Sequence, residues 1–511
     1  MLKNVKKPTK LVSKSTYLSL LQCPKLFWTI FNEPSSIPAQ ESGNQANQSR
    51  FDEGKLVEKY ARQLFADGIQ IDHSQPFPVI IAQSQAALDD SHANLPIYNP
   101  LISIGGLICE IDILVPRRIG GMRKYDIYEV KSSTHIKDHH LPDLSFQKYV
   151  CQKAGLSINQ AHLITINSTY VKQGEIKPKK LFSIQLMDEM IEPYFSKVGE
   201  NLRVGGNILS IYCPEIPIGC HCSSPYECPL MSVCWKKLLA NDDNIFSLTG
   251  LRAEKKWGLY NEGVLRTVKV PKNYQLNGKQ EIQIEADRTG KPNIDPKAIQ
   301  RFCNRLQFPI YFVDFETFNP AIPTLEGISP YQQIPFQYSL HVQTAPDQKP
   351  KAIKHHSWIW NGKGDPRVEL VKKLKGLLGN RGSIIVYNAQ FEKMILKQAI
   401  KAGKVAPSYD NWLEGILNRF VDLLEPFKAF HYYHPDQHGS ASIKSVLPVL
   451  TGKGYEDMDI SNGAIASTEY MRVMFTDEGK KDRARVFRQL EEYCGLDTWG
   501  MVEIVGKLKA V

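Results

Sequence analysis

The sequence predicts a mixed α/β protein with two large regions joined by a smaller connector. Its 511 residues, at roughly 150 residues per domain, correspond to two to four domains. With 42% hydrophobic and 23% charged residues, the chain has the composition of a folded globular protein. Short runs rich in Ile, Val and aromatic residues, typical of strands, alternate with longer segments of helical spacing. This alternation predicts an α/β fold in each large region.

We place the predicted boundaries at 1–238, 239–295 and 296–511. A stretch rich in Pro and Cys closes the first region. The connector begins with two short helical segments. Its polar residues 277–295 contain several turn formers and no sustained period, which predicts a linker or surface excursion. The sequence contains no internal repeat, heptad run or low-complexity tract.

Charge and cysteine content restrict the compartment and the partners. Lys and Arg number 63 against 53 Asp and Glu, and the net charge of +10 permits a polyanionic partner. Ten cysteines are too few for a disulfide scaffold. The basic first residues lack the apolar core of a signal peptide, and no run of about 20 apolar residues occurs. We therefore expect no membrane partner and a cytoplasmic protein with reduced thiols.

Two strand-like segments of the first region are predicted to bring carboxylates and a lysine together. Segment 101–116 contains Asp112, and segment 125–133 contains Glu129 and Lys131. Residues two apart on a strand share a face, so Glu129 and Lys131 lie on one side of the strand. Asp112 can lie opposite them on the neighbouring strand. The alternative without a functional role is that Glu129 and Lys131 form an exposed pair on a strand face.

Such a group suits metal-assisted hydrolysis of a phosphodiester. The carboxylates and the Val130 carbonyl can bind Mg²⁺, which prefers oxygen ligands. Lys131 can position the attacking water or neutralise charge that develops on the phosphate. Gln147 and Tyr149 lie on the helical segment that follows, where they could contact the phosphate backbone.

The order of strand pair, Glu-x-Lys and Gln-bearing helix resembles the PD-(D/E)xK nucleases, specifically the RecB-like branch. The resemblance implies a restriction-endonuclease-like α/β core and one Mg²⁺ or Mn²⁺ ion. It also implies a metal-binding His or carboxylate before the core, in a Gly-x-x-Val-His pattern. The matching stretch DEGKLVEKYA has Glu58 in place of the His. The implied metal ligands are therefore Glu58, Asp112 and Glu129, with Gln147 in support.

Cysteines gather at the end of the first region, and one lies far upstream. In RecB-like nucleases of the AddB and CRISPR-associated type, one Cys before the core joins three after it. This resemblance implies a [4Fe–4S] cluster on Cys23, Cys222, Cys228 and Cys234. Such a cluster would tie together the ends of a long segment and so restrict the unfolded chain. Soft thiolates select iron–sulfur or zinc over Mg²⁺.

Alternatives remain open for these cysteines. A zinc site could include Cys220 or His221, although no Cys-x₂-Cys pair occurs. Buried cysteines without a ligand are the third alternative. The roles of Cys213 and Cys220 stay ambiguous. We expect simple burial for the remaining cysteines, which are Cys109, Cys151, Cys303 and Cys494.

The second region contains three acidic motifs. Asp314 and Glu316 are two apart on the strand-like segment 310–318, so they share a face. Glu392 lies on a helical segment that follows another strand. Asp497 comes near the end of the chain, on a further helical segment. Two Mg²⁺ ions about 4 Å apart require such a set of four carboxylates from separate segments. One ion activates the attacking water, and the other stabilises the leaving oxygen.

Further residues accompany these carboxylates. Asn388 lies at a strand end before Glu392, and Tyr493 precedes Asp497 by four residues, on the same helical face. Tyr493 can orient the attacking water. Taken singly, each motif is more often solvated surface charge than a metal ligand. Three histidines in HYYHPDQH could suggest zinc, but an ordered loop with exposed side chains is the preferred interpretation for His431, His434 and His438.

In this order, the motifs resemble the DEDDy branch of the RNase H-like 3′–5′ exonucleases. The resemblance implies two Mg²⁺ or Mn²⁺ ions, with Glu392 replacing the usual Asp of the second motif. The segment HGSASIKSVLPVL is similar to a Ser-x-Lys-x-Val-Leu-Pro segment of related exonucleases, which makes Ser442 and Lys444 possible phosphate contacts. Asn388 is a further possible nucleic-acid contact, and Asp422 a further acidic residue near the site.

Together, the two regions resemble a bacterial family that fuses a RecB-like iron–sulfur nuclease to a DEDD exonuclease. Its Gly-x-His-Cys-x-x-Pro-x-x-Cys segment corresponds to GCHCSSPYEC, with Cys220 at the variable position. The resemblance implies a metal-dependent nuclease that acts on DNA in repair, recombination or defence. Two alternatives are an RNA-processing exonuclease, since such sites act on either polymer, and a nucleic-acid-binding adaptor with one degenerate centre.

Overall fold

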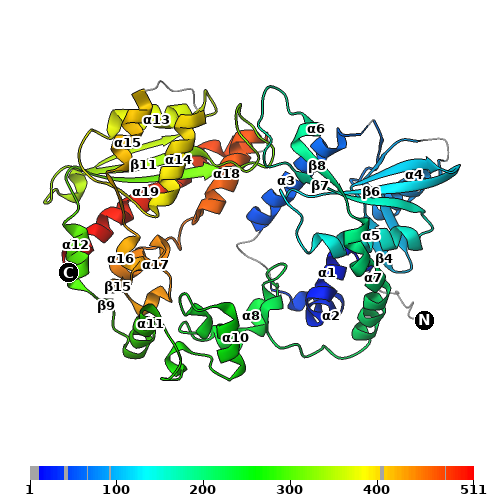
Figure 1. The fold of residues 1–511 in the computed structure, drawn as a ribbon, viewed down its shortest axis with the longest axis horizontal. Helices are drawn as coiled ribbons and strands as arrows, with labels where there is room; N and C mark the ends of the chain where they lie inside the picture. Colours follow the sequence, from blue (N-terminus) through cyan, green and yellow to red (C-terminus); the bar gives the residue numbers. More distant parts are fainter. Residues whose placement is uncertain (1–10, 39–43, 66, 91–93, 403–407, 478) are drawn as a thin grey trace, which may run out of the picture. The chain divides into compact units, whose positions relative to one another are not determined.

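The computed structural model describes residues 11–38, 44–65, 67–90, 94–402, 408–477 and 479–511. Its strands and helices confirm the mixed α/β class (Figure 1). The chain divides into two compact units, formed by residues 1–235 with 320–331 and by residues 236–319 with 332–511. Within the described ranges, no helix is both long and apolar enough to cross a bilayer.

The first unit is built on a six-stranded sheet in the order β1-β2-β5-β6-β7-β8. The central pair β5–β6 is antiparallel, and its two strands are joined by the left-handed glycines Gly120 and Gly121. Strand β7 adds to β6 in parallel. The strands are β1 (Ile69–Gln70), β2 (Ile97–Tyr98), β5 (Ile113–Ile119), β6 (Met122–Val130), β7 (Ile158–Ile166) and β8 (Phe182–Leu186), with a separate hairpin of β3 (Leu101–Ile104) and β4 (Leu107–Glu110).

Helices of the first unit cover both faces of this sheet. One core contains Tyr17, Phe27, Ile127 and Leu144, and the other contains Val57 and Tyr128 with Ala321 and Ile322. The helices are α1 (Lys14–Gln22), α2 (Pro24–Asn32), α3 (Asn44–Arg62), α4 (Phe77–Asp89), α5 (His140–Lys153), α6 (Pro178–Leu181), α7 (Asp188–Leu209) and α8 (Met231–Cys234). Because Ile127 and Tyr128 of β6 face opposite cores, Glu129 points to the side of α1 and α5.

Residues 320–331 fall within the range assigned to the second region by sequence, yet they pack in the first unit. Ala321 and Ile322 are buried in its core, and the Ala321 N–H donates to the Glu53 carboxylate over 2.9 Å. The Tyr331 hydroxyl donates to the carbonyl of Ser132, next to Lys131. Burial of these apolar side chains explains why residues 320–331 pack in the first unit although the residues on either side belong to the second.

The second unit contains a five-stranded sheet in the order β12-β11-β10-β13-β14. Strand β10 pairs antiparallel with β11 and parallel with β13. The strands are β10 (Ile310–Phe318), β11 (Ile334–Gln343), β12 (Lys354–Ile359), β13 (Ile384–Val386) and β14 (Phe420–Asp422). A short two-stranded sheet joins β9 (Asn293–Ile294) to β15 (Tyr432–Tyr433).

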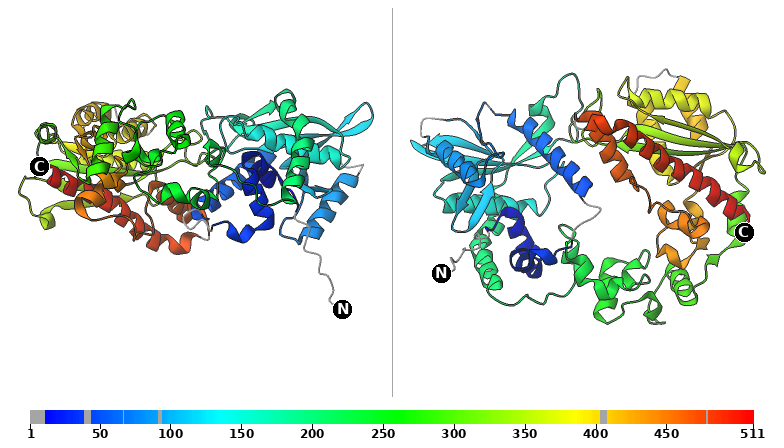
Figure 2. Two further views of the ribbon diagram at one scale, coloured as in Figure 1. Left: turned by 90° about the horizontal axis from the view of Figure 1, so that it is seen from below. Right: turned by 180° about the vertical axis from the view of Figure 1, so that it is seen from behind.

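Alternation along β10 separates the core of the second unit from its acidic residues. Tyr311, Val313 and Phe315 pack in the core with α13 (Pro366–Leu377), α14 (Ala389–Ala402) and α15 (Ser408–Leu417). The alternate residues, Asp314 and Glu316, therefore face the other side. There the sheet contacts α18 (Gly463–Phe475) and the long α19 (Arg483–Lys509), which crosses it in Figure 2.

The remaining helices of the second unit are short. They are α9 (Lys236–Leu239), α10 (Ala253–Asn261), α11 (Gly278–Thr289), α12 (Pro296–Cys303), α16 (Glu425–Lys428) and α17 (Ile443–Thr451). Helix α11 corrects the linker predicted for 277–295. Asn277 and Gln280 form a capping box, and Gly290 ends the helix in the left-handed conformation. The buried Gln280 and Gln283 amides bond to loop carbonyls, so a polar sequence without apolar period still forms an anchored helix.

Candidate functional site

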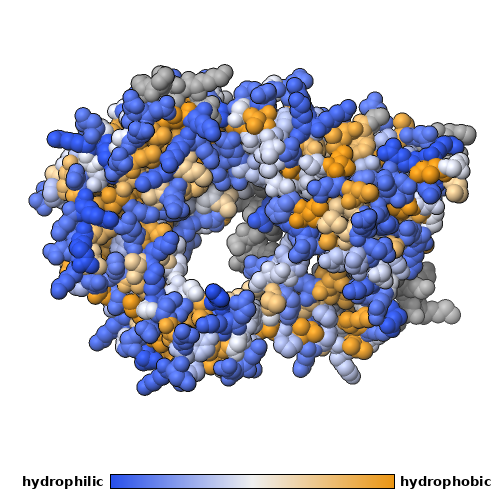
Figure 3. Space-filling view, viewed as in Figure 1, coloured by the Kyte–Doolittle hydropathy of each residue, from blue (hydrophilic) through white to orange (hydrophobic). Residues whose placement is uncertain are grey.

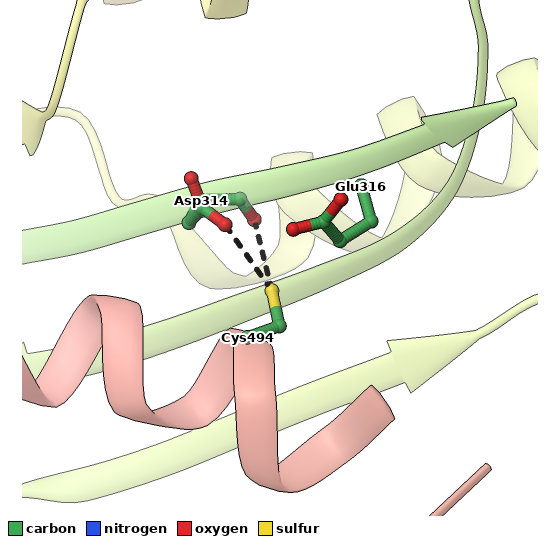
Figure 4. A group of neighbouring side chains, drawn as sticks. All are labelled: Asp314, Glu316 and Cys494. Carbon is green, nitrogen blue, oxygen red and sulfur yellow. Dashed lines mark hydrogen bonds between the residues drawn. The ribbon is translucent and has the colours of Figure 1, made fainter. Parts of the chain in front are cut away.

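The acidic residues of β10 meet helix α19 in the second unit. One ligand atom each from Asp314, Glu316 and Cys494 lies within 4.8 Å of the other two (Figure 4). The Cys494 thiol donates to the Asp314 carboxylate, with Sγ 3.4 Å from Oδ2. Among the described residues this is the one group of three such side chains close enough to share a single ion. The sequence predicted Cys494 as a simply buried cysteine; it is buried, but it is also part of this group.

One turn further along α19, Asp497 joins a pair of tyrosines and a lysine. The Tyr455 hydroxyl donates to Oδ1 of Asp497, and the rings of Tyr455 and Tyr493 lie 6.0 Å apart. The Lys444 ammonium lies 5.4 Å from both ring centres. Tyr455 was not predicted as a site residue, because nothing in its local sequence connects it with Asp497, 42 residues later.

Glu392, on α14, interacts with this group electrostatically, because its charge acts on Glu316 and the charge of Asp314 acts on Glu392. Its side chain is 2% exposed, and Oε2 has no hydrogen-bond partner. Asp422 has a different role, because its carboxylate accepts the backbone N–H groups of Asn388 and Ala389 at the start of α14, over 2.9 and 3.1 Å. Asp422 therefore caps the helix that carries Glu392.

Ionisation of the four carboxylates of the second unit is unfavourable in the folded protein. Burial raises the pKa of each, to about 9 for Glu392 and to about 6 for Asp497. The pKa values of Asp314 and Glu316 also lie well above their usual range, because burial and the neighbouring carboxylates disfavour ionisation. Lys444 partly offsets this repulsion at Glu316 and Asp497. A group of this kind gains stability by binding either protons or a cation.

Protons should therefore stabilise the metal-free protein. Because the pKa of Glu392 is about 9 when folded and 4.5 in its unperturbed state, the folded chain holds a proton that the unfolded chain releases. The contribution of Glu392 to the free energy of unfolding is full below about pH 4.5 and falls as the pH rises towards about 9. Thermal unfolding in EDTA across this range should show wild type losing more stability than Glu392→Gln. Equal slopes for the two proteins would contradict this.

The other predicted residues of the second unit occupy distinct positions. Ser442 is exposed at the N-cap of α17, where its hydroxyl contacts those of Ser440 and Ser445. Asn388 is exposed and has a φ of 77° at the turn before α14. Of the three predicted loop histidines, His438 is exposed, while His431 and His434 are half-buried. No described group of three potential metal ligands includes any of them.

In the first unit, Glu129 receives two lysines on one oxygen. Lys131 Nζ lies 2.7 Å and Lys14 Nζ lies 2.8 Å from Oε1 of Glu129. Lys131 also contacts Oδ2 of Asp143 over 2.6 Å, and Gln147 donates to the other oxygen of Asp143 over 3.1 Å. Oε2 of Glu129, which is 1% exposed, has no hydrogen-bond partner, and neither has Oε1 of Gln147.

The charges of this group balance more closely than those of the second unit. Although burial opposes it, Lys131 and Lys14 together lower the pKa of Glu129 far below its usual range. Asp143 and Glu129 raise the pKa of Lys131 in turn, so its ammonium stays protonated. The pKa of Asp112 is raised by burial and by Glu129, and its Oδ2 accepts the Val130 N–H over 2.7 Å. Asp112, Glu129 and Lys131 thus lie together at the end of β6.

Lys14 and Asp143 were missed by sequence reasoning. Lys14 lies 115 residues before Glu129, on the first turn of α1, where Ser13 caps the helix. Asp143 precedes Gln147 by four residues on α5, so the two share a helical face. This spacing was a readable signal for Asp143. Nothing local in the sequence indicates Lys14.

Two predicted residues of the first unit have other principal contacts. Glu58, on α3, accepts from Arg62 and Asn99 over 2.5 and 2.8 Å, and its charge acts on Asp112. Tyr149 packs its ring against Phe195 of α7, 6.4 Å between centres. Six residues after Asp143, Tyr149 lies on a different face of α5 and does not join the acidic group.

The four predicted cluster cysteines line one small cavity, together with His221. Cys23 is buried between α1 and α2, while Cys222 and Cys228 are buried in the segment after α7. Burial raises the pKa of Cys228 to about 11, and the charges of the other three cysteines act in the same direction. Gln22 fixes this segment by donating to the carbonyls of His221 and Tyr226, over 2.8 and 2.7 Å.

The spacing of these cysteines bears on the choice of metal. Tetrahedral zinc, with Zn–S bonds of about 2.3 Å, would hold its thiolates roughly 3.8 Å apart. Within the described residues, no three of these Cys and His side chains have ligand atoms within 4.8 Å of one another. An iron–sulfur cluster binds each thiolate to a separate iron and so holds the sulfurs farther apart. Cys109, Cys151 and Cys494 are buried, as predicted, whereas Cys303 is half-buried.

Comparisons with known proteins identify relatives without a described activity. A family described as a domain of unknown function (DUF2779) matches residues 311–442, which include Asp314, Glu316 and Glu392 but not Asp497. An uncharacterized protein of Mycoplasma pneumoniae, the MG366 homolog, is 22% identical over 261 residues, covering 48% of this chain and 38% of that protein. Uncharacterized protein MG366 of Mycoplasma genitalium is 24% identical over 216 residues, covering 40% and 32%. The chain thus spans about a third of the length of these relatives.

Proposed function

We propose that the chain is a metal-dependent nuclease with two hydrolytic centres and that DNA is its substrate. The first unit would act as a RecB-like PD-(D/E)xK nuclease and the second as a DEDDy-type, RNase H-like 3′–5′ exonuclease. The observation that carries the proposal is the convergence of Asp314, Glu316, Glu392 and Asp497 from three separate elements, with raised pKa values and an unpartnered oxygen on Glu392.

In the second unit these four carboxylates would hold two Mg²⁺ or Mn²⁺ ions, which activate water and stabilise the leaving oxygen when bound. The donor set fits hard cations, since its ligands are carboxylate oxygens, and Cys494 adds one softer donor. Burial and the nearby carboxylates keep the pKa of Tyr493 far above neutrality, so its hydroxyl stays protonated and can orient a water. Lys444 lies beside Glu316 and Asp497, where it can contact a phosphate.

In the first unit, Asp112 and Glu129 would hold one Mg²⁺ or Mn²⁺, with Glu58 nearby. The fit is supported by Oε2 of Glu129, a buried carboxylate oxygen without a protein partner. The Lys131 ammonium, held by Glu129 and Asp143, supplies positive charge for the phosphate as charge develops on it. Lys14 keeps Glu129 ionised and oriented.

Replacement of Lys14 tests this arrangement. Lys14→Met removes one of the two cations on Glu129 and should lower first-centre cleavage roughly tenfold, as changes to groups that orient a metal ligand do. Lys131→Ala should cost more, since Lys131 is expected to contact the substrate. Cleavage is measured in an Asp314→Asn background, where the second centre is silent. A Lys14→Met protein with unchanged cleavage would show that Lys14 is not needed at this centre.

For the cysteines, we propose a structural [4Fe–4S] cluster on Cys23, Cys222, Cys228 and Cys234, with zinc as the alternative. The support is that all four line one cavity although they come from opposite ends of the first unit. The cluster would join α1 and α2 to the segment after α7 and needs no part in hydrolysis. Repair, recombination or defence against foreign DNA would suit such an enzyme.

The substrate is tested with matched single- and double-stranded DNA and RNA oligonucleotides labelled at either end. Preferential loss of DNA label in Mg²⁺ supports the proposal. Preferential degradation of RNA would favour the alternative exoribonuclease, because the contacts that read a 2′-hydroxyl decide between the polymers.

A further inference from the structure

An exposed tyrosine lies at the rim of the first centre. Tyr226 belongs to the cysteine-rich segment, and its side chain is 54% exposed. Its ring lies 4.9 Å from that of His139, tilted by 58°. His139 immediately precedes α5, the helix that carries Asp143. Burial raises the pKa of Tyr226, and the charges of Lys131, Asp143 and Lys14 also act on it.

The surrounding backbone holds Tyr226 in this position. The Cys228 N–H donates to the Cys222 carbonyl over 2.8 Å and closes a loop with Tyr226 inside it. Gln22 holds the Tyr226 carbonyl at 2.7 Å. Burial in an apolar core does not explain the position, because Tyr226 remains 54% exposed. The loop thus presents an exposed aromatic side chain that contacts His139, just before the helix of Asp143, and on which the charges of Lys131 and Lys14 act.

We infer that Tyr226 is a specificity residue that stacks on an unpaired base of a single-stranded DNA substrate while Lys131 contacts the neighbouring phosphate. This inference rests on the proposed nuclease function of the first centre. An aromatic ring beside cationic side chains is the arrangement by which proteins hold single strands without reading their sequence. A paired base is already stacked within its duplex, so the ring favours single-stranded ends over intact duplex.

The loop also connects the cysteines with substrate binding. Both residues that close it, Cys222 and Cys228, are proposed cluster ligands. The cluster would therefore set the position of Tyr226 without contacting the substrate.

The test uses anaerobically purified full-length protein in an Asp314→Asn background, with Tyr226→Ala, Tyr226→Phe and the matched control Tyr212→Ala. Tyr212 is in the same segment and 94% exposed. Tyr226→Ala should raise KM for single-stranded DNA roughly tenfold with little change in kcat, as loss of a base–aromatic stack predicts. Tyr226→Phe keeps the ring and should behave as the parent, as should Tyr212→Ala.

A second measurement does not require cleavage. In Ca²⁺, the fluorescence of a terminal 2-aminopurine in a single strand should change on binding to the parent and to Tyr226→Phe, but not to Tyr226→Ala. Unchanged KM and fluorescence in Tyr226→Ala, or a Tyr226→Phe protein as weak as Tyr226→Ala, would overturn the stacking role while leaving the nuclease proposal intact. A ring-dependent fluorescence change without any Lys131-dependent cleavage would support stacking and reject the nuclease function of the first centre.

Discussion

Asp314→Asn should abolish the trimming of DNA 3′ ends, whereas Lys131→Ala should leave that trimming intact. Asp314 is the residue that both Glu316 and Cys494 approach, and its amide isostere cannot carry the negative charge that holds a divalent cation. We expect a loss of about 1,000-fold or more, because metal ions contribute several kcal/mol to such reactions. Lys131 belongs to the first unit, where its ammonium is paired with Glu129 and Asp143.

The measurement is the shortening of 5′-labelled DNA in Mg²⁺. Glu414→Gln provides a matched control, since Glu414 is an exposed carboxylate on α15. Its trimming rate should equal that of wild type. Full trimming by Asp314→Asn would remove the second centre from the account, and loss of trimming in Lys131→Ala would show that the two centres are not independent.

Cys222→Ser should remove the proposed cluster and destabilise the first unit. We expect loss of a broad absorption band near roughly 400 nm in anaerobically purified protein. The unfolding free energy of that unit should fall by about 5 kcal/mol, the effect of opening a long cross-linked loop. Trimming of 3′ ends should persist, because Cys222 lies in the first unit and the four carboxylates lie in the second.

Cys220→Ser is the matched control for the cysteine prediction. Cys220 is exposed and two residues away from Cys222, so the band and the stability should both be retained. Protein that lacks the band and contains one equivalent of zinc would contradict the cluster, and loss of that zinc in Cys220→Ser would assign Cys220 as a ligand.

Figure 3 shows a surface on which hydrophilic side chains predominate and apolar ones are scattered. This distribution agrees with the composition of the sequence, which carries 63 Lys and Arg and 53 Asp and Glu. Because the carboxylates proposed to bind metal are largely buried, they contribute little to the exposed charge.

The spacing of residues along the sequence predicted which neighbouring site residues lie close together. The two-residue spacing of Asp314 and Glu316 places both on one side of β10. Glu129 lies on β6, and Lys131, one residue past the end of that strand, still contacts it. Periodicity could not predict Lys14, whose contact with Glu129 spans 115 residues. Such contacts depend on how α1 packs across the sheet, and a single sequence carries no direct signal for that packing.

Composition also misled in two places. Polar residues 277–295 suggested a linker, yet Gln280 and Gln283 are buried through hydrogen bonds instead of apolar contacts, and α11 forms. The capping box of Asn277 and Gln280 was the signal that could have identified this helix. Residues 320–331 join the first unit through Ala321 and Ile322. Two adjacent apolar residues are too few to form a recognisable apolar pattern in the sequence.

The central claim is that this chain hydrolyses phosphodiesters at two metal-dependent centres. Its most direct test compares wild type with the double variant Asp314→Asn, Lys131→Ala on end-labelled DNA, with Mg²⁺ or Mn²⁺ and with EDTA. We expect degradation by wild type, complete inhibition by EDTA, and no degradation by the double variant. Tight metal-dependent binding by wild type without hydrolysis in either metal would contradict the nuclease function and indicate a binding adaptor. Undiminished hydrolysis by the double variant would show that these two centres are not the sites of hydrolysis.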